Sequence, residues 1–255
     1  MSRTRGRAPG GRAGLRAPWL VVAIALAAAT GCAGVDVPQM PGPAITDWVP
    51  PSGADPGDGS STLSPDGFAS AERMAVRIRN VGCDSLSTGS GFALDARTLV
   101  TNRHVVVDSS ELQVETYDGR DIAVTAAASA ALADLAVIRT AEDLPDHPEL
   151  AGSDPELGDS VSVIGYPLGG LLTVTTGRVI GRTTDPLNEN LGEVLVTDAE
   201  VAPGSSGSAV VDSEGRVVGV VYAKNAADQS FIVPVSTVRN LLADDSAFAP
   251  VDACG

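Results

Sequence analysis

Short apolar runs separated by turn signals fill most of the chain after residue 67. In one of them Val76 and Ile78 alternate with arginines, a period of two residues that is typical of half-buried strands. Six such runs lie within residues 68–148 and six more within residues 157–235. Short strands at this spacing close into small barrels. We therefore predict an all-β fold of two six-stranded antiparallel β-barrels.

The segments around the two barrels differ in composition. Residues 236–243 place three apolar side chains on one face, which predicts a short C-terminal helix with Ser236 as its N-cap. Residues 32–67 are rich in Pro, Gly, Ser and Asp and carry few apolar side chains, which predicts a flexible tether. We assign residues 68–255 to one two-lobed domain and expect no further domain after it.

Residues 1–31 have the composition of an export signal. Five arginines and no acidic residue occur there, and an apolar run follows that is short for a bilayer span. The run ends in Ala-Thr-Gly before Cys32, which is typical of a bacterial lipobox. We predict lipidation of Cys32 and attachment to the membrane through that lipid. Ordinary cleavage near Ala33 and an uncleaved anchor are the alternatives.

The charge of the chain argues against nucleic acid as a partner. The formal net charge is −15, and without residues 1–31 the chain carries 12 basic against 32 acidic residues, a net charge of −20. Such a surface repels the phosphate backbone. Two histidines and three scattered cysteines offer no metal-ligand spacing, so we expect neither a metal nor another cofactor.

A small-residue turn, residues 201–209, holds Ser206 close to two glycines. Gly204 tolerates a positive φ, and such a turn lifts the serine hydroxyl away from its own backbone. The amides of Gly204 and Ser206 would then point the same way and form an oxyanion hole. This geometry suits an acyl-transfer nucleophile. A serine-glycine surface loop is the alternative interpretation.

Two further polar residues stand at the ends of apolar strand-like runs. His104 lies near the end of the run at residues 98–106, and Asp134 directly precedes the run at residues 135–140. The order His, Asp, Ser is that of one type of catalytic triad, with His104 as the base and Asp134 as the residue that orients it. Asp108 and Asp121 are rival carboxylates, and a buried structural histidine is the alternative for His104.

These residues resemble the trypsin-like serine proteases of the bacterial HtrA/Deg kind. The resemblance implies a chymotrypsin-like fold, serine endopeptidase activity, and catalytic roles for His104, Asp134 and Ser206. The cysteines near both ends of the domain make the chain more similar to the MarP-like acid-resistance branch, although no PDZ module is expected here. The matching motifs are Gly89-Ser90-Gly91-Phe92, Leu99 to Val106, Asp134-Leu135-Ala136-Val137, Gly165-Tyr166-Pro167, Thr197-Asp198-Ala199 and Pro203 to Gly207.

The resemblance also indicates residues that contact substrate. Glu200 stands at the position of the floor of the primary specificity pocket, where it would favour Arg or Lys; a solvent-facing glutamate, or one paired with Arg182, is the alternative. Substrate backbone would pair with the strand edge at Gly219, Val220 and Val221.

The number of cysteines predicts one disulfide, because three cysteines are an odd number for an exported protein. With Cys32 lipidated, Cys83 and Cys254 remain, and we predict a disulfide between them, with two free thiols as the alternative. The function we expect is an exported serine endopeptidase that cleaves proteins or peptides at the cell envelope through an acyl-enzyme on Ser206. A catalytically silent binding or scaffold module of the envelope is the alternative.

Overall fold

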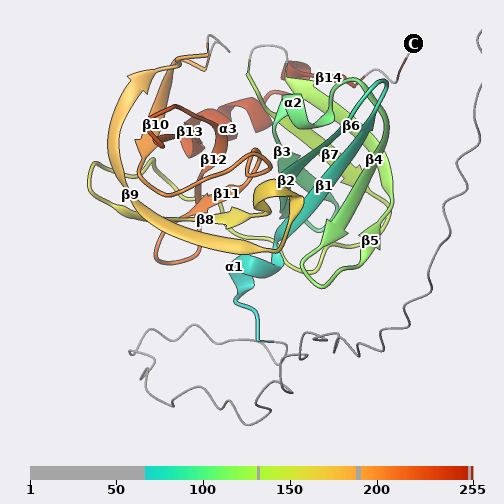
Figure 1. Cartoon of the computed structure of the whole chain (residues 1–255), viewed down its shortest axis with the longest axis horizontal. Coiled ribbons are helices and arrows are strands. Elements are labelled where there is room, and N and C mark those ends of the chain that lie inside the picture. Colours follow the sequence, from blue (N-terminus) through green and yellow to red (C-terminus); the bar gives the residue numbers. More distant parts are fainter. Residues whose placement is uncertain (1–66, 131–132, 188–190, 252–253, 255) are drawn as a thin grey trace, which may run out of the picture. The chain divides into compact units, whose positions relative to one another are not determined.

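The computed structural model describes residues 67–255 except 131–132, 188–190, 252–253 and 255. The signal, the tether and Cys32 lie outside these residues. Strands dominate and form two sheets that lie side by side (Figure 1). The first sheet contains β1 (Ala75–Gly82), β2 (Leu86–Asp95), β3 (Thr98–Thr101), β4 (Ser109–Thr116), β5 (Asp121–Ile122), β6 (Val124–Ala130), β7 (Ala136–Thr140) and β14 (Phe248–Pro250). The second contains β8 (Ser160–Gly165), β9 (Thr173–Thr184), β10 (Glu193–Thr197), β11 (Ala209–Val211), β12 (Val217–Lys224) and β13 (Ser230–Pro234).

The first sheet has eight strands in the order β14-β6-β7-β3-β2-β1-β4-β5, so the predicted count of six was wrong. One apolar run of the sequence, residues 122–127, is broken at Ala123 into β5 and β6. The eighth strand, β14, comes from the C-terminal segment and pairs Phe248 with Ala130. Three residues are too few to show a period of two, so the sequence pattern carries no sign of β14.

The second sheet closes as predicted. Its six strands form a barrel in the order β10-β13-β12-β11-β8-β9. Small aliphatic side chains fill the barrel, because β-branched residues pack well against a pleated surface. A second buried cluster runs from the first sheet into this barrel and includes Phe92, Val106, Val220 and Tyr222. This continuous core fixes how the two lobes meet. The residues at the barrel centre include Val161, Val163, Val179, Leu195, Val210, Val218 and Ile232.

The helices are short and stand at the ends of strands. They are α1 (Ser70–Arg73), α2 (Arg103–Val106), α3 (Val235–Leu242) and the 3-10 turns η1 (Pro167–Gly169) and η2 (Asp245–Ala247). The predicted C-terminal helix is α3, but Pro234 is its N-cap. Ser236 lies in the first turn, where the Asp154 carboxylate accepts its backbone N–H at 2.8 Å. Among the described residues, no helix is both long enough and apolar enough to cross a bilayer.

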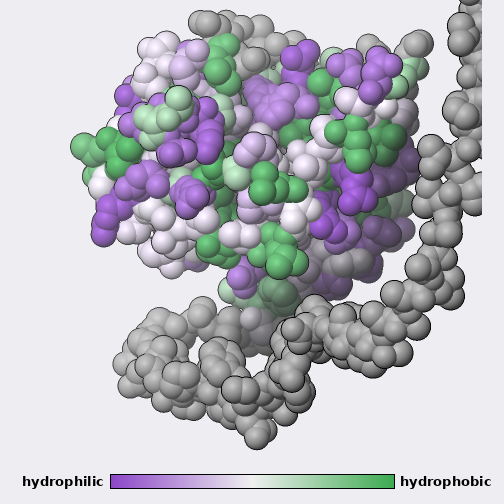
Figure 2. Space-filling model, in the orientation of Figure 1, coloured by the Kyte–Doolittle hydropathy of each residue, from purple (hydrophilic) through white to green (hydrophobic). Residues whose placement is uncertain are grey.

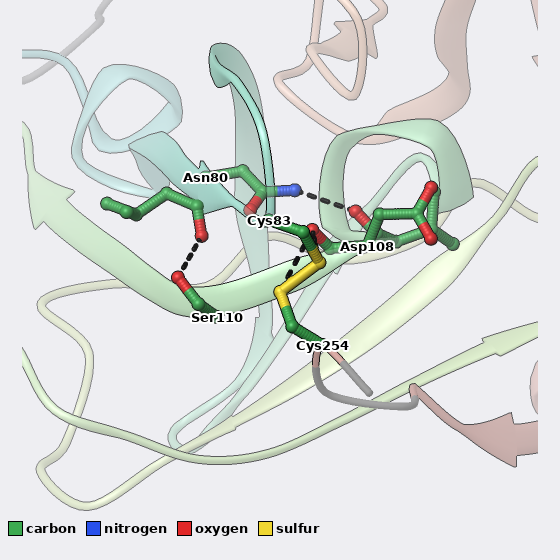
Figure 3. Close-up of a disulfide and its surroundings, with 7 residues drawn as sticks. Asn80, Cys83, Asp108, Ser110 and Cys254 are labelled. Atoms are coloured by element: carbon green, nitrogen blue, oxygen red, sulfur yellow. Dashed lines mark hydrogen bonds between the residues drawn. A yellow bond between two sulfur atoms is a disulfide. The ribbon is translucent and has the colours of Figure 1, made fainter.

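A disulfide joins Cys83 to Cys254 across 171 positions of sequence, with their Cα atoms 5.6 Å apart (Figure 3). It ties the C-terminal segment to the end of β1. The backbone N–H of Cys83 also donates to the Asp108 carbonyl at 3.1 Å. Asn80 Nδ2 donates to the carbonyls of Val105 and Val107 at 3.1 and 2.9 Å. The disulfide therefore lies beside Asp108, in the segment that follows helix α2.

The surface is mostly polar on the face seen in Figure 2, with scattered apolar patches. Two of the most exposed large apolar side chains are close together in sequence, at and after η1. Leu168 is 74% exposed and Leu171 is 86% exposed. Since single exposed apolar residues are common, it is the position of Leu168 beside the serine turn that makes this segment notable.

Candidate active site

The structure brings His104 and Asp134 together. His104 Nδ1 lies 2.6 Å from Asp134 Oδ2, and the backbone N–H of His104 donates to Asp134 Oδ1 at 3.0 Å. Asn102 Nδ2 donates to the Asp134 carbonyl at 2.7 Å and fixes the turn before β7. The Asp134 side chain is 8% exposed and that of His104 is 49% exposed. An imidazole held through Nδ1 presents Nε2 to the other side, as a general base requires.

The elements that carry this pair differ from the expected ones. β3 ends at Thr101, and His104 lies in the short helix α2 instead of in the predicted strand 98–106. The rival carboxylates lie elsewhere, with Asp121 in β5 and Asp108 at a φ of 54° beside Cys83. The other histidine, His147, is exposed and bonds through its backbone N–H to its neighbour Asp146.

The serine turn is held in one shape by its own backbone. Ser205 N–H donates to the Ala202 carbonyl, and Ser208 N–H donates to the Ser205 carbonyl, both at 2.9 Å. Gly207 N–H donates to the Val221 carbonyl at 2.9 Å, which ties the turn to β12. Of the three serines, Ser205 and Ser208 are buried and only Ser206 is partly exposed. Ser206 is therefore the serine whose hydroxyl a substrate can reach.

Glycine is required at two positions of this turn. Gly204 has a φ of 93° and Gly207 a φ of 85°, values that L side chains rarely adopt. A Cβ at Gly204 would lie 2.8 Å from the backbone nitrogen of Leu168. A Cβ at Gly207 would lie 2.1 Å from the Ser90 carbonyl oxygen and 2.5 Å from Thr101 Oγ1. Backbone of the first lobe and of η1 therefore packs directly onto the turn.

Two amides of the turn are left over for a ligand. The carbonyl of Pro203 accepts the N–H of Leu168 at 2.6 Å, and that of Ser205 accepts Ser208. Because C=O and N–H point in opposite directions across a trans peptide, the N–H groups of Gly204 and Ser206 face away from these acceptors. Within the described part of the chain neither N–H donates a hydrogen bond. Such a pair of unused amides can bind a developing oxyanion.

The strand that leads to His104 contacts the serine turn through Thr101 and Ser90, since a Cβ at Gly207 would lie 2.5 Å from Thr101 Oγ1. Thr101 Oγ1 donates to the Ser90 carbonyl at 2.6 Å, and Ser90 N–H donates to the Ser206 carbonyl at 2.8 Å. Across the residues described, no hydrogen bond joins the imidazole to the Ser206 hydroxyl. Bonds between a catalytic base and its nucleophile tighten when substrate binds.

A small pocket of about 160 Å³ adjoins Ser206, and Glu200 does not line it. Its apolar walls include Val201, Ala202, Val221 and Ala223. Lys224 also lines it, with Nζ 3.1 Å from the Val201 carbonyl and 3.0 Å from the Asp228 carboxylate.

Glu200 is exposed and lines a separate pocket of about 230 Å³ together with Val163 and Thr175. Arg182, the partner considered for Glu200, pairs with Glu193 and Asp154 instead. The structure thus places Lys224, rather than a carboxylate, beside the serine.

The three residues expected to form a free strand edge differ in their surroundings. Gly219 and Val220 pair with β11 on one side and with β13 on the other, so neither has an edge to offer. Val221 is bonded to the serine turn through both its N–H and its carbonyl. The free edge lies further along, where Ala223 and Lys224 pair only with β13. A register shift between Val221 and Ala223 moves the free edge to this position, and no sequence pattern predicts that shift.

No group of three or more His, Cys, Asp or Glu side chains that could hold a metal ion occurs among the described residues.

Comparisons with known proteins identify the family of the chain. A family model described as a trypsin-like peptidase domain matches residues 89–220, and the chain belongs to that family. A probable periplasmic DegP-like serine endoprotease of Hahella chejuensis is 34% identical over 174 residues, which cover 64% of this chain and 37% of the relative. The serine protease Rv3671c of Mycobacterium tuberculosis is 29% identical over 198 residues, which cover 72% of this chain and 49% of the relative.

A solved structure is similar over most of the described residues. The crystal structure of the Rv3671c protease in its active form matches with a TM-score of 0.64 and 28% identity, and the match covers 72% of this chain and 86% of that one. The fold is therefore chymotrypsin-like, of the kind found in HtrA proteases. The chain spans about half or less of the length of the curated relatives described above.

Proposed function

We propose that this protein is a serine endopeptidase in which His104 and Asp134 of the first lobe activate Ser206 of the second. The 2.6 Å contact between His104 Nδ1 and Asp134 Oδ2 is the observation that carries the proposal. With Nδ1 so engaged, Nε2 accepts the proton of the Ser206 hydroxyl as its Oγ attacks the scissile carbonyl. The unused amides of Gly204 and Ser206 stabilise the oxyanion. His104 then protonates the leaving amine, and water hydrolyses the acyl-enzyme by the same route.

The pocket beside Ser206 supports a preference for a small aliphatic residue on the acyl side of the cleaved bond. Its volume of about 160 Å³ and its Val and Ala walls suit side chains such as Val or Ala. Among the described residues that line the pocket there is no carboxylate to pair with an Arg or Lys side chain, and the Lys224 ammonium already pairs with Asp228. The extended edge at Ala223 supports backbone pairing with the substrate, which gives affinity without sequence preference.

Hydrolysis of an unfolded protein substrate by the purified full-length chain tests the activity. The proposal predicts cleavage by the wild type and a loss of at least about 10⁴-fold in Ser206→Ala. Ser205→Ala and Ser208→Ala are matched controls in the same turn, and we expect both to retain measurable activity. Folded wild-type protein without activity, with denatured protein bound in the cleft, would instead support the binding module.

We further propose export and action at the cell envelope, with a lipid on Cys32. The support comes from the composition of residues 1–31, from the Cys83–Cys254 disulfide, which is typical of oxidising compartments, and from the word periplasmic in the name of one relative. Intact-mass analysis of protein extracted from membranes tests the anchor. A mature chain that begins at Cys32 and carries acyl groups is expected, and an unmodified Cys32 excludes it.

A further inference from the structure

The turn that carries the Gly204 amide is held by Leu168 of its own barrel and also by contacts from the first sheet. The serine turn fixes the peptide after Gly204 and the peptide after Ser206 through the carbonyls of those residues. Ser90, in β2 of the first sheet, holds both of these carbonyls. Its N–H donates to the Ser206 carbonyl and its hydroxyl donates to the Gly204 carbonyl, each at 2.8 Å. Ser90 is fully buried, so no water competes for these bonds.

The same hydroxyl also reaches the segment that precedes η1. Ser90 Oγ accepts the N–H of Tyr166 at 2.8 Å. Two residues later, the N–H of Leu168 donates to the Pro203 carbonyl and so turns the Gly204 amide outward. Ser90 therefore bonds next to both partners of the contact that orients the Gly204 amide: to Gly204, which follows Pro203, and to Tyr166, two residues before Leu168.

Leu168 performs this task in an uncommon backbone conformation. Its φ is 58°, in the left-handed region that a leucine rarely occupies. Its side chain is 74% exposed, so packing of that side chain does not hold the residue in place. The conformation needs support from elsewhere, because strained residues persist only where their surroundings determine them.

Arg77 of β1 supplies that support. Its Nη1 donates to the carbonyls of Gly169 and Gly170 at 3.0 and 3.1 Å, directly after Leu168. Its Nη2 binds both oxygens of Glu115 at 2.5 and 2.6 Å, which orients the guanidinium. The guanidinium also lies 5.8 Å from the centroid of the Tyr166 ring. Only the planar guanidinium of an arginine, which carries five N–H donors, can make all of these contacts at the same time.

We propose that Ser90 and Arg77 are positioning residues through which the first lobe holds the Gly204 amide in its oxyanion-binding orientation. This inference rests on the proposed function. Both residues act through the serine turn and η1, so they affect the step in which charge develops on the substrate oxygen. They do not line the pocket beside Ser206, so substrate affinity does not depend on them.

The test compares Ser90→Ala and Arg77→Met with wild type and with Thr140→Val in the full-length chain. Thr140 is a matched control, because its buried hydroxyl also donates to a backbone carbonyl, that of Glu142 at 2.8 Å, within the first sheet. For both variants we expect kcat on a peptide amide to fall about ten- to a hundredfold while KM changes less than about twofold. Arg77→Lys, which can reach only part of the set of partners, should give an intermediate kcat.

A second readout separates positioning from general destabilisation. A peptide aldehyde forms a hemiacetal whose oxygen occupies the oxyanion hole, so its Ki should rise in parallel with the loss of kcat, at unchanged melting temperature in Arg77→Met. The proposal is overturned if kcat and Ki stay at wild-type values, or if Thr140→Val shows the same losses. If Ser90→Ala does not fold, the partly exposed Arg77 still provides the test. An inactive folded wild type refutes the proposed function instead, which keeps the two failures distinct.

Discussion

The two halves of the site are built differently. The His104–Asp134 pair lies in the first lobe, His104 in α2 after β3 and Asp134 just before β7, and hydrogen bonds within that lobe fix it. Ser206 lies on a turn of the second barrel whose carbonyls are held by Leu168 of the same barrel and by Ser90 of the first sheet. The base is therefore assembled by one lobe alone, whereas the turn that carries the oxyanion-binding amides is also held across the lobe interface, by Ser90. Changes at that interface should affect the second half of the site and leave the first intact.

The largest effect is expected from the pair within the first sheet. Asp134→Asn should lower kcat about 10⁴-fold at unchanged fold, because an amide stabilises the wrong tautomer of His104. Asp121→Asn, a rival carboxylate on the same sheet, serves as the control and should stay within about twofold of wild type. Steady-state hydrolysis with circular dichroism makes the measurement. Equal effects of the two substitutions would show that Asp134 has no special role.

The second-largest effect is expected on the free energy of unfolding, when the disulfide beside the end of helix α2 is removed. Replacing both Cys83 and Cys254 by serine removes a cross-link that closes a loop of 171 residues. Chain entropy predicts a decrease of about 4–5 kcal/mol in the free energy of unfolding. Denaturant titration measures it, and hydrogen exchange should show the loss first in β14 and β1. An unchanged midpoint would mean that the first lobe does not rely on this link.

A smaller effect is expected in the pocket of the second lobe. Lys224→Ala removes the side chain that bonds to the Val201 carbonyl at the pocket. The preference for Leu over Val at the cleaved residue should then rise about tenfold in kcat/KM, since one methylene contributes about 1–3 kcal/mol. Arg97→Ala, on a turn of the first sheet, is the control. An unaltered preference would place the specificity elsewhere.

The smallest effect is expected on the stability of the folded protein at high pH, through the buried hydroxyl of Tyr166. Burial raises the pKa of Tyr166 from 10.0 to about 12. The unfolded chain therefore loses this proton first, so the contribution is complete below pH 10 and stability falls as pH rises from 10 to 12. Tyr166→Phe lacks the ionisable group, and its melting temperature should decline less steeply between pH 10 and about 12. Parallel curves for the two proteins would contradict the burial of this hydroxyl in a folded lobe interface.

Sequence reasoning found the parts of the site that depend on local patterns. The strand periods indicated the second barrel, and the glycines around Ser206 indicated the turn whose positive φ values require them. The contacts that cross between lobes have no such pattern, so Ser90 and Arg77 were missed. Counting back from Ser206 reached Glu200, but β-strand pairing places Ala223 and Lys224 at the pocket instead. β14 was missed because its pairing depends on where the C-terminal segment returns.

The most direct measurement is covalent labelling with a peptidyl organophosphonate followed by peptide mapping of the full-length protein. Two lobes that share one site predict a single adduct on the Ser206 hydroxyl, absent from Ser206→Ala and slowed at least about 10³-fold in His104→Ala. Labelling of another residue, or labelling of Ser206 at the wild-type rate without His104, would contradict the account.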